Sequence, residues 1–166
     1  GKECSTQPMP FISEKIPTFE EFANASIEEI YGEEIVDAYE RKVTSFESII
    51  LINKGENKFE IEKLPPLAQS IPILTSDSYD INEDGYEDVI VGGNIYNTEV
   101  ETPRLDNQFA IILISDKNKN YSTIGPDKSG LYLSGNTKSL KIIDRKNPKL
   151  LVANNNSNLE VFELNK

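Results

Sequence analysis

The chain has 166 residues, enough for one domain with a hydrophobic core, and its 37% hydrophobic and 27% charged residues are typical of a folded protein. Its 28 acidic residues outnumber 17 basic ones, and the formal charge of -11 argues against binding to nucleic acid or anionic lipid. The chain contains no histidine, which excludes Ser-His-Asp and Cys-His catalysis and imidazole-ligated zinc.

The first segment, residues 1–17, contains three prolines and little apolar periodicity, so we expect an extended lead-in. It contains Cys4, the single cysteine of the chain, which excludes an internal disulfide and predicts a free or buried thiol. No apolar run is long enough to predict a transmembrane helix.

Residues 18–45 are predicted to form a helical segment that packs on a following β region. Apolar residues recur at helical spacing between Ile27 and Tyr39, with acidic residues on the other face, and Gly32 is the expected break between two short helices. Two helix starts carry the pattern in which a hydroxyl and a carboxylate reciprocally satisfy free main-chain amides. These pairs are Thr18 with Glu21 and Ser26 with Glu29.

The hydrophobic period changes at Phe46, and residues 46–166 are predicted to be β structure. Short apolar runs, each bounded by Asn, Asp, Gly or Pro, predict small antiparallel sheets, and the run IPIL at 71–74 is one expected strand. Gly55 lies in the turn of the first predicted hairpin. The predicted fold class is therefore mainly β, in a single domain with an N-terminal helical segment.

The segment DINEDGYEDVIV, residues 80–91, crowds acidic side chains against an apolar strand. Its alternate Asp and Asn side chains point to one side of a tight loop, where oxygen ligands can enclose Ca²⁺ at about 2.3–2.6 Å, and Gly85 permits the sharp turn. Val91 stands where an EF-hand carries a bidentate Glu, so EF-hand helices are not expected. The alternative is a solvated turn without metal. The predicted Ca²⁺ ligands are Asp80, Asn82, Asp84, Asp88 and the main-chain carbonyl of Tyr86.

A second candidate site is the long polar loop at 94–108, because long structured loops often carry function. The loop could grip a sugar or a peptide, or an internal ion pair, Glu99–Arg104 or Arg104–Asp106, could hold it together. A further Asp/Asn ladder at 115–122 lacks glycine and is predicted to be a hairpin turn. The candidate ligand-binding residues of the loop are Asn94, Tyr96, Glu99, Arg104 and Asp106.

The acidic loop, together with the overlapping segment DVIVGGN at 88–94, resembles the FG-GAP or VCBS repeats. These are β-propeller repeats that carry a calcium-binding loop, and they are related to those of integrin α subunits. The resemblance extends, in order, through QPMPFI, PTFEEFANASIEEIYGEE, SIILINKGENKFEIEKLP, GGNIYNTEVETPRLD and LLVANNN to the C-terminal region of VCBS-repeat proteins of Bacteroidetes-type bacteria. It implies antiparallel β-propeller-like blades, in a partial propeller of about two to three blades. Placing the strands by this resemblance gives the outer hairpin of one blade at 46–64, a fuller blade at 70–125 and a shortened blade at 139–164. A propeller typically needs at least four blades, so we expect a fragment whose neighbours are further blades of a larger parent chain.

The functional prediction combines the loop chemistry with this resemblance. We expect a non-enzymatic calcium-binding β-propeller repeat module with Ca²⁺ as its only cofactor. The resemblance implies an exported bacterial protein, periplasmic, cell-surface or extracellular, that acts as a scaffold or as a recognition surface for a protein or a glycan. The alternative is a carbohydrate-active or other hydrolytic domain that uses loop carboxylates such as Glu99 and Asp106, which would have to flank the scissile bond.

Overall fold

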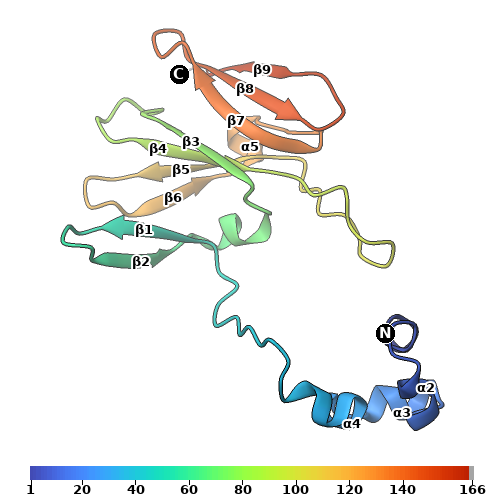
Figure 1. Cartoon of the computed structure of the whole chain (residues 1–166). Helices are drawn as coiled ribbons and strands as arrows, with labels where there is room; N and C mark the ends of the chain where they lie inside the picture. The colour runs from blue at the N-terminus through green and yellow to red at the C-terminus, as the bar shows by residue number, and fades with distance from the viewer. Residues whose placement is uncertain (165–166) are drawn as a thin grey trace. The chain divides into compact units, whose positions relative to one another are not determined.

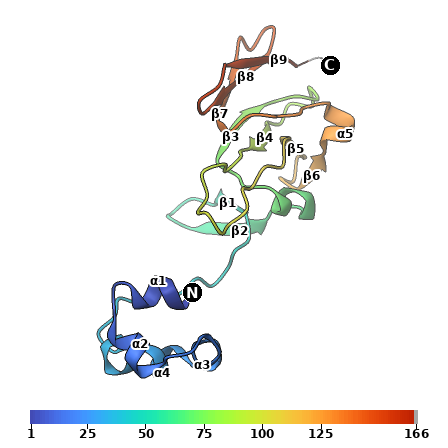
Figure 2. The same ribbon diagram turned by 90° about the vertical axis from the view of Figure 1, so that its right-hand side faces the viewer.

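The computed structural model describes residues 1–164, with Glu34 described by its backbone alone. The chain divides into two compact units, residues 1–45 and residues 46–166. Figures 1 and 2 show the helices of the first unit and the sheets of the second in two views. Within the described residues, no helix has the length and apolar character needed to cross a membrane.

Short helices form the first unit, and two of them lie where we expected an extended lead-in, so the prediction for 1–17 is wrong. The prolines do not prevent these helices, because Pro8 lies between them and Pro10 is the N-cap of the second, where its missing N–H costs no hydrogen bond. The helices are α1 (Lys2–Thr6), α2 (Phe11–Lys15), α3 (Phe19–Asn24), α4 (Ile27–Tyr31) and the 3-10 helix η1 (Gly32–Ile35).

Both predicted helix starts are confirmed. At the start of α3, Glu21 N donates to the Thr18 hydroxyl at 3.1 Å, and Thr18 N donates to the Glu21 carboxylate at 3.1 Å. Ser26 and Glu29 form the same reciprocal pair at the start of α4. Each pair satisfies two main-chain amides that have no partner within the helix.

The core of the first unit is small and isoleucine-rich. Ile12, Ile16 and Ile30 are buried together, so the short helices are held by contacts with one another. At Gly32 the backbone turns to φ +64° and ends α4. The prediction of helix through residue 45 is wrong in its last third, because residues 39–48 form neither helix nor strand.

The second unit contains three antiparallel sheets, in agreement with the predicted fold class and the three predicted regions. The first sheet is the hairpin β1 (Ile49–Asn53) and β2 (Phe59–Lys63). The middle sheet has the order β3 (Thr75–Tyr79), β4 (Asp88–Gly92), β5 (Ile111–Ser115) and β6 (Tyr121–Ile124). The third contains β7 (Thr137–Ile143), β8 (Lys149–Asn154) and β9 (Glu160–Glu163). Two short helices, η2 (Pro66–Ser70) and α5 (Pro126–Ser129), interrupt the connections.

One strand lies outside its predicted position. The apolar run 71–74 precedes the strand β3, whose sequence TSDSY is polar. The polar segment forms a strand because it pairs with β4 from Thr75–Gly92 to Tyr79–Asp88, and because its side chains bond to the third sheet.

The middle sheet is covered on both faces. On one face, Ile90 and Ile112 join a core with buried residues of β7 and β8. On the other, Val91, Ile111 and Leu113 pack with Leu64, η2 and the inner face of β1. The alternation along β4 and β5 thus sends successive side chains to two different cores.

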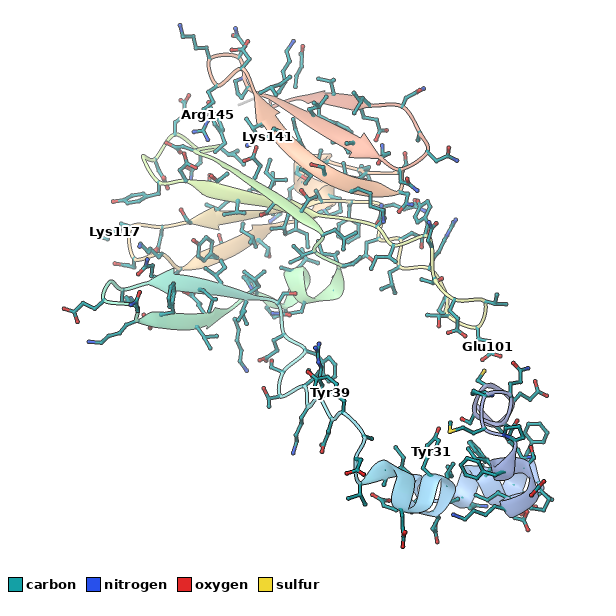
Figure 3. All side chains as sticks on the ribbon, in the orientation of Figure 1. Tyr31, Tyr39, Glu101, Lys117, Lys141 and Arg145 are labelled. Atoms are coloured by element: carbon teal, nitrogen blue, oxygen red, sulfur yellow. The ribbon has the colours of Figure 1, made fainter. Side chains whose placement is uncertain are left out.

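The side chains of β3 satisfy the free edge of β7. The Asp77 carboxylate, only 13% exposed, accepts a hydrogen bond of 2.6 Å from Ile142 N and pairs with Lys141 Nζ at 3.0 Å. Thr75 Oγ1 accepts from Leu140 N at 2.9 Å. These bonds join the middle and third sheets and occupy amides that would otherwise be exposed on an edge strand. Figure 3 shows Lys141 at this junction.

We predict that Asp77→Ala lowers the free energy of unfolding by about 2 kcal/mol, because Ile142 N loses a charged acceptor. Lys141→Ala should cost less than about 0.5 kcal/mol, since the lysine is 67% exposed and main-chain capping is retained. Urea denaturation of both variants at neutral pH tests this. Equal losses in the two variants would show that the ion pair, and not the main-chain bond, holds the sheets together.

The same carboxylate should make stability depend on pH. Burial raises the pKa of Asp77, but hydrogen bonds from Ile142 N, Lys141 and Ser78 N outweigh it and hold the pKa below its ordinary value of 3.8. A folded-state pKa below the unfolded one stabilises the protein above pH 3.8, and this stabilisation is lost as the pH falls through the lowered value. The difference in stability between the parent and Asp77→Ala should therefore shrink below that pH.

Candidate functional site

The acidic loop joins β3 to β4 and is folded around its own side chains. The Asp80 carboxylate accepts from Asp84 N at 3.1 Å and from Gly85 N at 2.9 Å. Gly85 has φ +90°, a conformation that glycine adopts at little cost, and this reverses the chain toward β4. Asp80 thus stabilises the turn by accepting hydrogen bonds from two main-chain amides of the same loop.

The next two ladder residues continue this arrangement. Asn82 Oδ1 accepts from Asp84 N at 3.1 Å, and Asn82 Nδ2 donates to the Asp84 carboxylate at 3.0 Å. The same carboxylate accepts from Tyr86 N at 2.9 Å. Amide N–H dipoles therefore oppose the mutual repulsion of the carboxylates, and the oxygens of Asp80, Asn82 and Asp84 gather on the inside of one turn.

Asp88, the last ladder residue, is completely buried. One of its oxygens accepts from Ile81 N at 3.0 Å and the other from Ser115 N at 2.8 Å. It therefore joins the start of the loop to the end of β5, a structural role that sequence analysis did not predict. Each carboxylate oxygen has two lone-pair positions, so these bonds still leave acceptor capacity on Asp88.

The donor chemistry of the loop fits a hard cation. All five predicted ligands offer oxygen: three carboxylates, the amide of Asn82 and the main-chain carbonyl of Tyr86. Within residues 1–164 no three or more Cys, Asp or Glu side chains are arranged to hold a metal by themselves. An ion in this loop would therefore depend on the amide and carbonyl oxygens as well as on the carboxylates.

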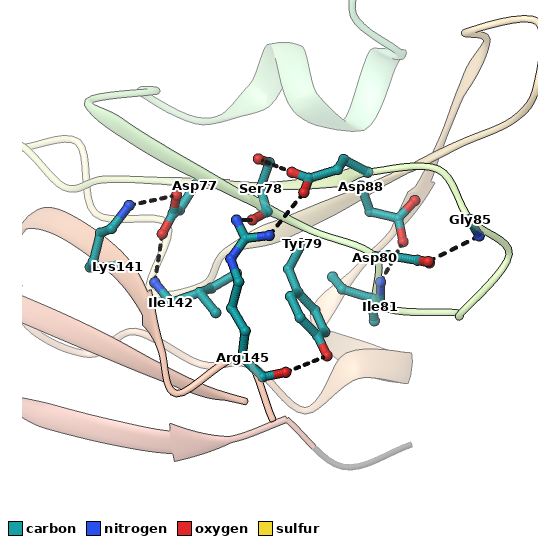
Figure 4. Close-up of polar contacts among 11 residues, drawn as sticks. Asp77, Ser78, Tyr79, Asp80, Ile81, Gly85, Asp88, Lys141, Ile142 and Arg145 are labelled. Atoms are coloured by element: carbon teal, nitrogen blue, oxygen red, sulfur yellow. Dashed lines mark hydrogen bonds and ion pairs between the residues drawn. The ribbon is translucent and has the colours of Figure 1, made fainter. Parts of the chain in front are cut away.

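A cluster that sequence analysis missed supports the loop from the side of the third sheet. Arg145 donates to the Glu87 carboxylate at 2.9 Å and to Ser78 O at 3.1 Å, while the Tyr79 hydroxyl donates to Arg145 O at 3.3 Å. The Ser78 hydroxyl also bonds to Glu87, and these hydrogen bonds from Ser78 and Arg145 lower the pKa of Glu87. Figure 4 shows this cluster beside Asp80 and Asp88. Arg145 lies in the β7–β8 turn, far from the loop in sequence, so no local pattern could have revealed the contact.

The structure divides the residues predicted in the 94–108 loop. Arg104 pairs with Asp106 at 2.8 Å and stacks over the Tyr96 ring at 4.6 Å, and the Tyr96 hydroxyl donates to Ser134 O. The predicted Arg104–Asp106 pair is confirmed. Glu99 instead accepts a bond from the Thr102 hydroxyl at 3.3 Å.

Asn94, at the start of that loop, is a buried anchor and not a groove residue. Its side-chain amide donates to Leu133 O at 3.1 Å and Gly135 O at 2.6 Å. Its Oδ1 is buried without a protein partner, as is the Oδ1 of Asn136. The five predicted loop residues therefore do not form one site.

The second ladder is a hairpin turn, as predicted. The Asp116 carboxylate accepts from Asn118 N at 2.7 Å, from Asn120 N at 3.0 Å and from Asn120 Nδ2 at 2.9 Å. These bonds, led by those from Asn120, lower the pKa of Asp116. In this turn, as in the acidic loop, an Asp carboxylate accepts hydrogen bonds from main-chain amides of the same turn. The turn has no counterparts of the carboxylates of Asp84 and Asp88.

Comparison with known proteins adds no relative to this picture. No family model, no curated protein and no solved structure matches the chain.

We predict that Asp88→Ala lowers the free energy of unfolding by about 3 kcal/mol, because the buried Ser115 N and the partly buried Ile81 N lose their charged acceptor. The loss should be the same in EDTA and in calcium-free buffer without chelator, since both bonds are internal to the protein. Urea denaturation measures it. A variant as stable as the parent would show that Asp88 does not join the loop to β5.

Proposed function

We propose that this chain is a calcium-binding β-propeller-type repeat module of an exported bacterial protein, and that it acts as a scaffold or recognition surface without enzymatic activity. The observation that carries the proposal is the folded acidic loop, in which the side-chain oxygens of Asp80 and Asn82 both accept from Asp84 N, just before the buried strand β4. Bound Ca²⁺ would neutralise this charge and cross-link the turn.

The arrangement of the sheets supports the blade part of the proposal. Each of the three sheets is antiparallel, and each packs face to face with the next through aliphatic side chains. β-Propellers are built from small antiparallel sheets of this kind, repeated radially. The resemblance of the acidic loop and the following strand to FG-GAP and VCBS repeats points the same way.

Both carboxylates nominated for hydrolysis have local partners. Asp106 is paired with Arg104, and Glu99 accepts a hydrogen bond from the Thr102 hydroxyl. These contacts favour a structural role for the two residues, which supports a binding module over a hydrolase.

Calcium should raise the stability of the second unit. Extracellular-type sites bind with dissociation constants on the order of 10⁻⁴–10⁻³ M, and a hundredfold excess of ligand adds about 2.7 kcal/mol of stability. We predict that the parent chain melts at a higher temperature in millimolar calcium than in EDTA. Differential scanning calorimetry measures the shift, and titration calorimetry measures the binding.

Two variants with the same chemical change provide the control. Asp84→Ala should abolish the calcium-dependent shift, whereas Asp116→Ala removes a carboxylate from a similar Asx turn and should leave the shift intact. The calcium proposal is wrong if the parent melts equally in both buffers, or if both variants lose the shift alike.

The outer face of the first sheet supports a scaffold role. Strand β1 reads IILIN and strand β5 reads IILIS, yet Ile111 and Leu113 of β5 are 0% and 1% exposed, whereas Ile49 and Leu51 of β1 are 41% and 57% exposed. A continuous apolar run is typical of a strand covered on both faces. We therefore propose that a further sheet, in the form of a neighbouring blade, covers this face.

We predict that the double variant Leu51→Ser, Ile61→Ser changes the free energy of unfolding by less than about 1 kcal/mol, because both side chains are more than half exposed. Ile50→Ser on the opposite face should cost about 2 kcal/mol, since it places a hydroxyl in the core between the first two sheets. Urea denaturation distinguishes them. A loss in the double variant as large as that of Ile50→Ser would contradict an open outer face.

A further inference from the structure

A cleft lies between β1 and the loops of the middle sheet, beside the acidic loop. Its volume is about 370 Å³, within the range of small-molecule sites. Ile50 and Ile52 of the first sheet line it, together with Tyr86 of the acidic loop and Tyr121 of β6. The cleft is thus bounded by two sheets and by the proposed calcium loop.

The two tyrosines supply aromatic walls from different elements. Tyr86 is 43% exposed, and its main chain is held by the bond from its N–H to the Asp84 carboxylate. Tyr121 is half-buried against the core between the sheets, and this burial, with the Glu62 and Asp88 carboxylates, raises the pKa of its phenol. The Tyr121 hydroxyl can donate a hydrogen bond, as a tyrosine phenol does at neutral pH.

Polar groups at the rim are already oriented. The Asp116 carboxylate is fixed by three donors of its own turn, and the Glu87 carboxylate is fixed by Arg145 and Ser78. Each retains lone pairs for a hydroxyl donor, and Lys119 adds an ammonium group. Apolar walls with a few fixed acceptors and donors suit a ligand that has both C–H faces and hydroxyl groups.

We propose that this cleft binds a neutral saccharide ring, stacked on Tyr86 and hydrogen-bonded at the rim by Asp116, Glu87 and Lys119. The carboxylates and the net charge of -11 disfavour an anionic ligand. Because the acidic loop also holds Tyr86, calcium in the loop orders the stacking wall and strengthens saccharide binding. This coupling rests on the proposed calcium function, whereas the cleft itself does not.

The test uses the full chain and a panel of free monosaccharides: glucose, galactose, mannose, xylose and N-acetylglucosamine. Saturation-transfer NMR at millimolar sugar detects binding, with and without calcium. We expect at least one sugar to bind, and Tyr86→Ala to weaken it about tenfold because the aromatic contact is lost. Tyr132→Ala, an exposed tyrosine outside the cleft, is the matched control and should bind sugar as the parent does.

The outcomes separate the two proposals. The cleft proposal is overturned if no sugar in the panel binds, with or without calcium, or if Tyr86→Ala binds sugar as well as the parent. If sugar binds and the Tyr86→Ala loss is seen while calorimetry detects no calcium, the cleft stands and the calcium function is wrong. If both bind and EDTA leaves the sugar affinity unchanged, the coupling is wrong.

Discussion

The second unit depends on one constraint: the middle strands β4 and β5 are apolar on both faces, so both faces must be covered. Their side chains alternate between two cores, one shared with β7 and β8 and one with the first hairpin and η2. Such strands gain most from burial when a sheet lies on each side. The three-layer arrangement follows from this requirement.

Carboxylates that accept main-chain amides hold the second unit together, between the middle and third sheets at Asp77 and within the middle sheet at Asp88 and Asp116. Asp77 satisfies the edge of β7, Asp88 joins the acidic loop to β5, and Asp116 closes the β5–β6 turn. Hydrogen bonds to an ionised acceptor are stronger than neutral ones, so single residues are sufficient at each junction. Part of the large negative charge of the chain is thus used to hold the backbone and does not face a ligand.

Short sequence patterns correctly predicted those elements whose formation depends on residues close together in the sequence. The β1–β2 hairpin follows from the turn at Gly55, and the starts of α3 and α4 follow from their capping pairs. Strand β3 was misplaced because its sequence is polar and its partners, β4 and β7, are set by tertiary structure. The Asp/Asn ladder was visible in the sequence, but the burial of Asp88 was not, since its partner Ser115 N lies 27 residues away.

The same separation in sequence sets an order of assembly. The β1–β2 hairpin closes over a few residues, whereas the bond between Asp77 and Ile142 N spans 65 residues. Contacts between distant residues must first overcome the entropy of closing a long loop, so local hairpins form early and distant junctions form late. We therefore expect the contacts between sheets to form after the local hairpins. Interactions that form after the transition state mainly control the unfolding rate, so we expect the β3–β7 junction to affect the lifetime of the native state more than the speed of reaching it.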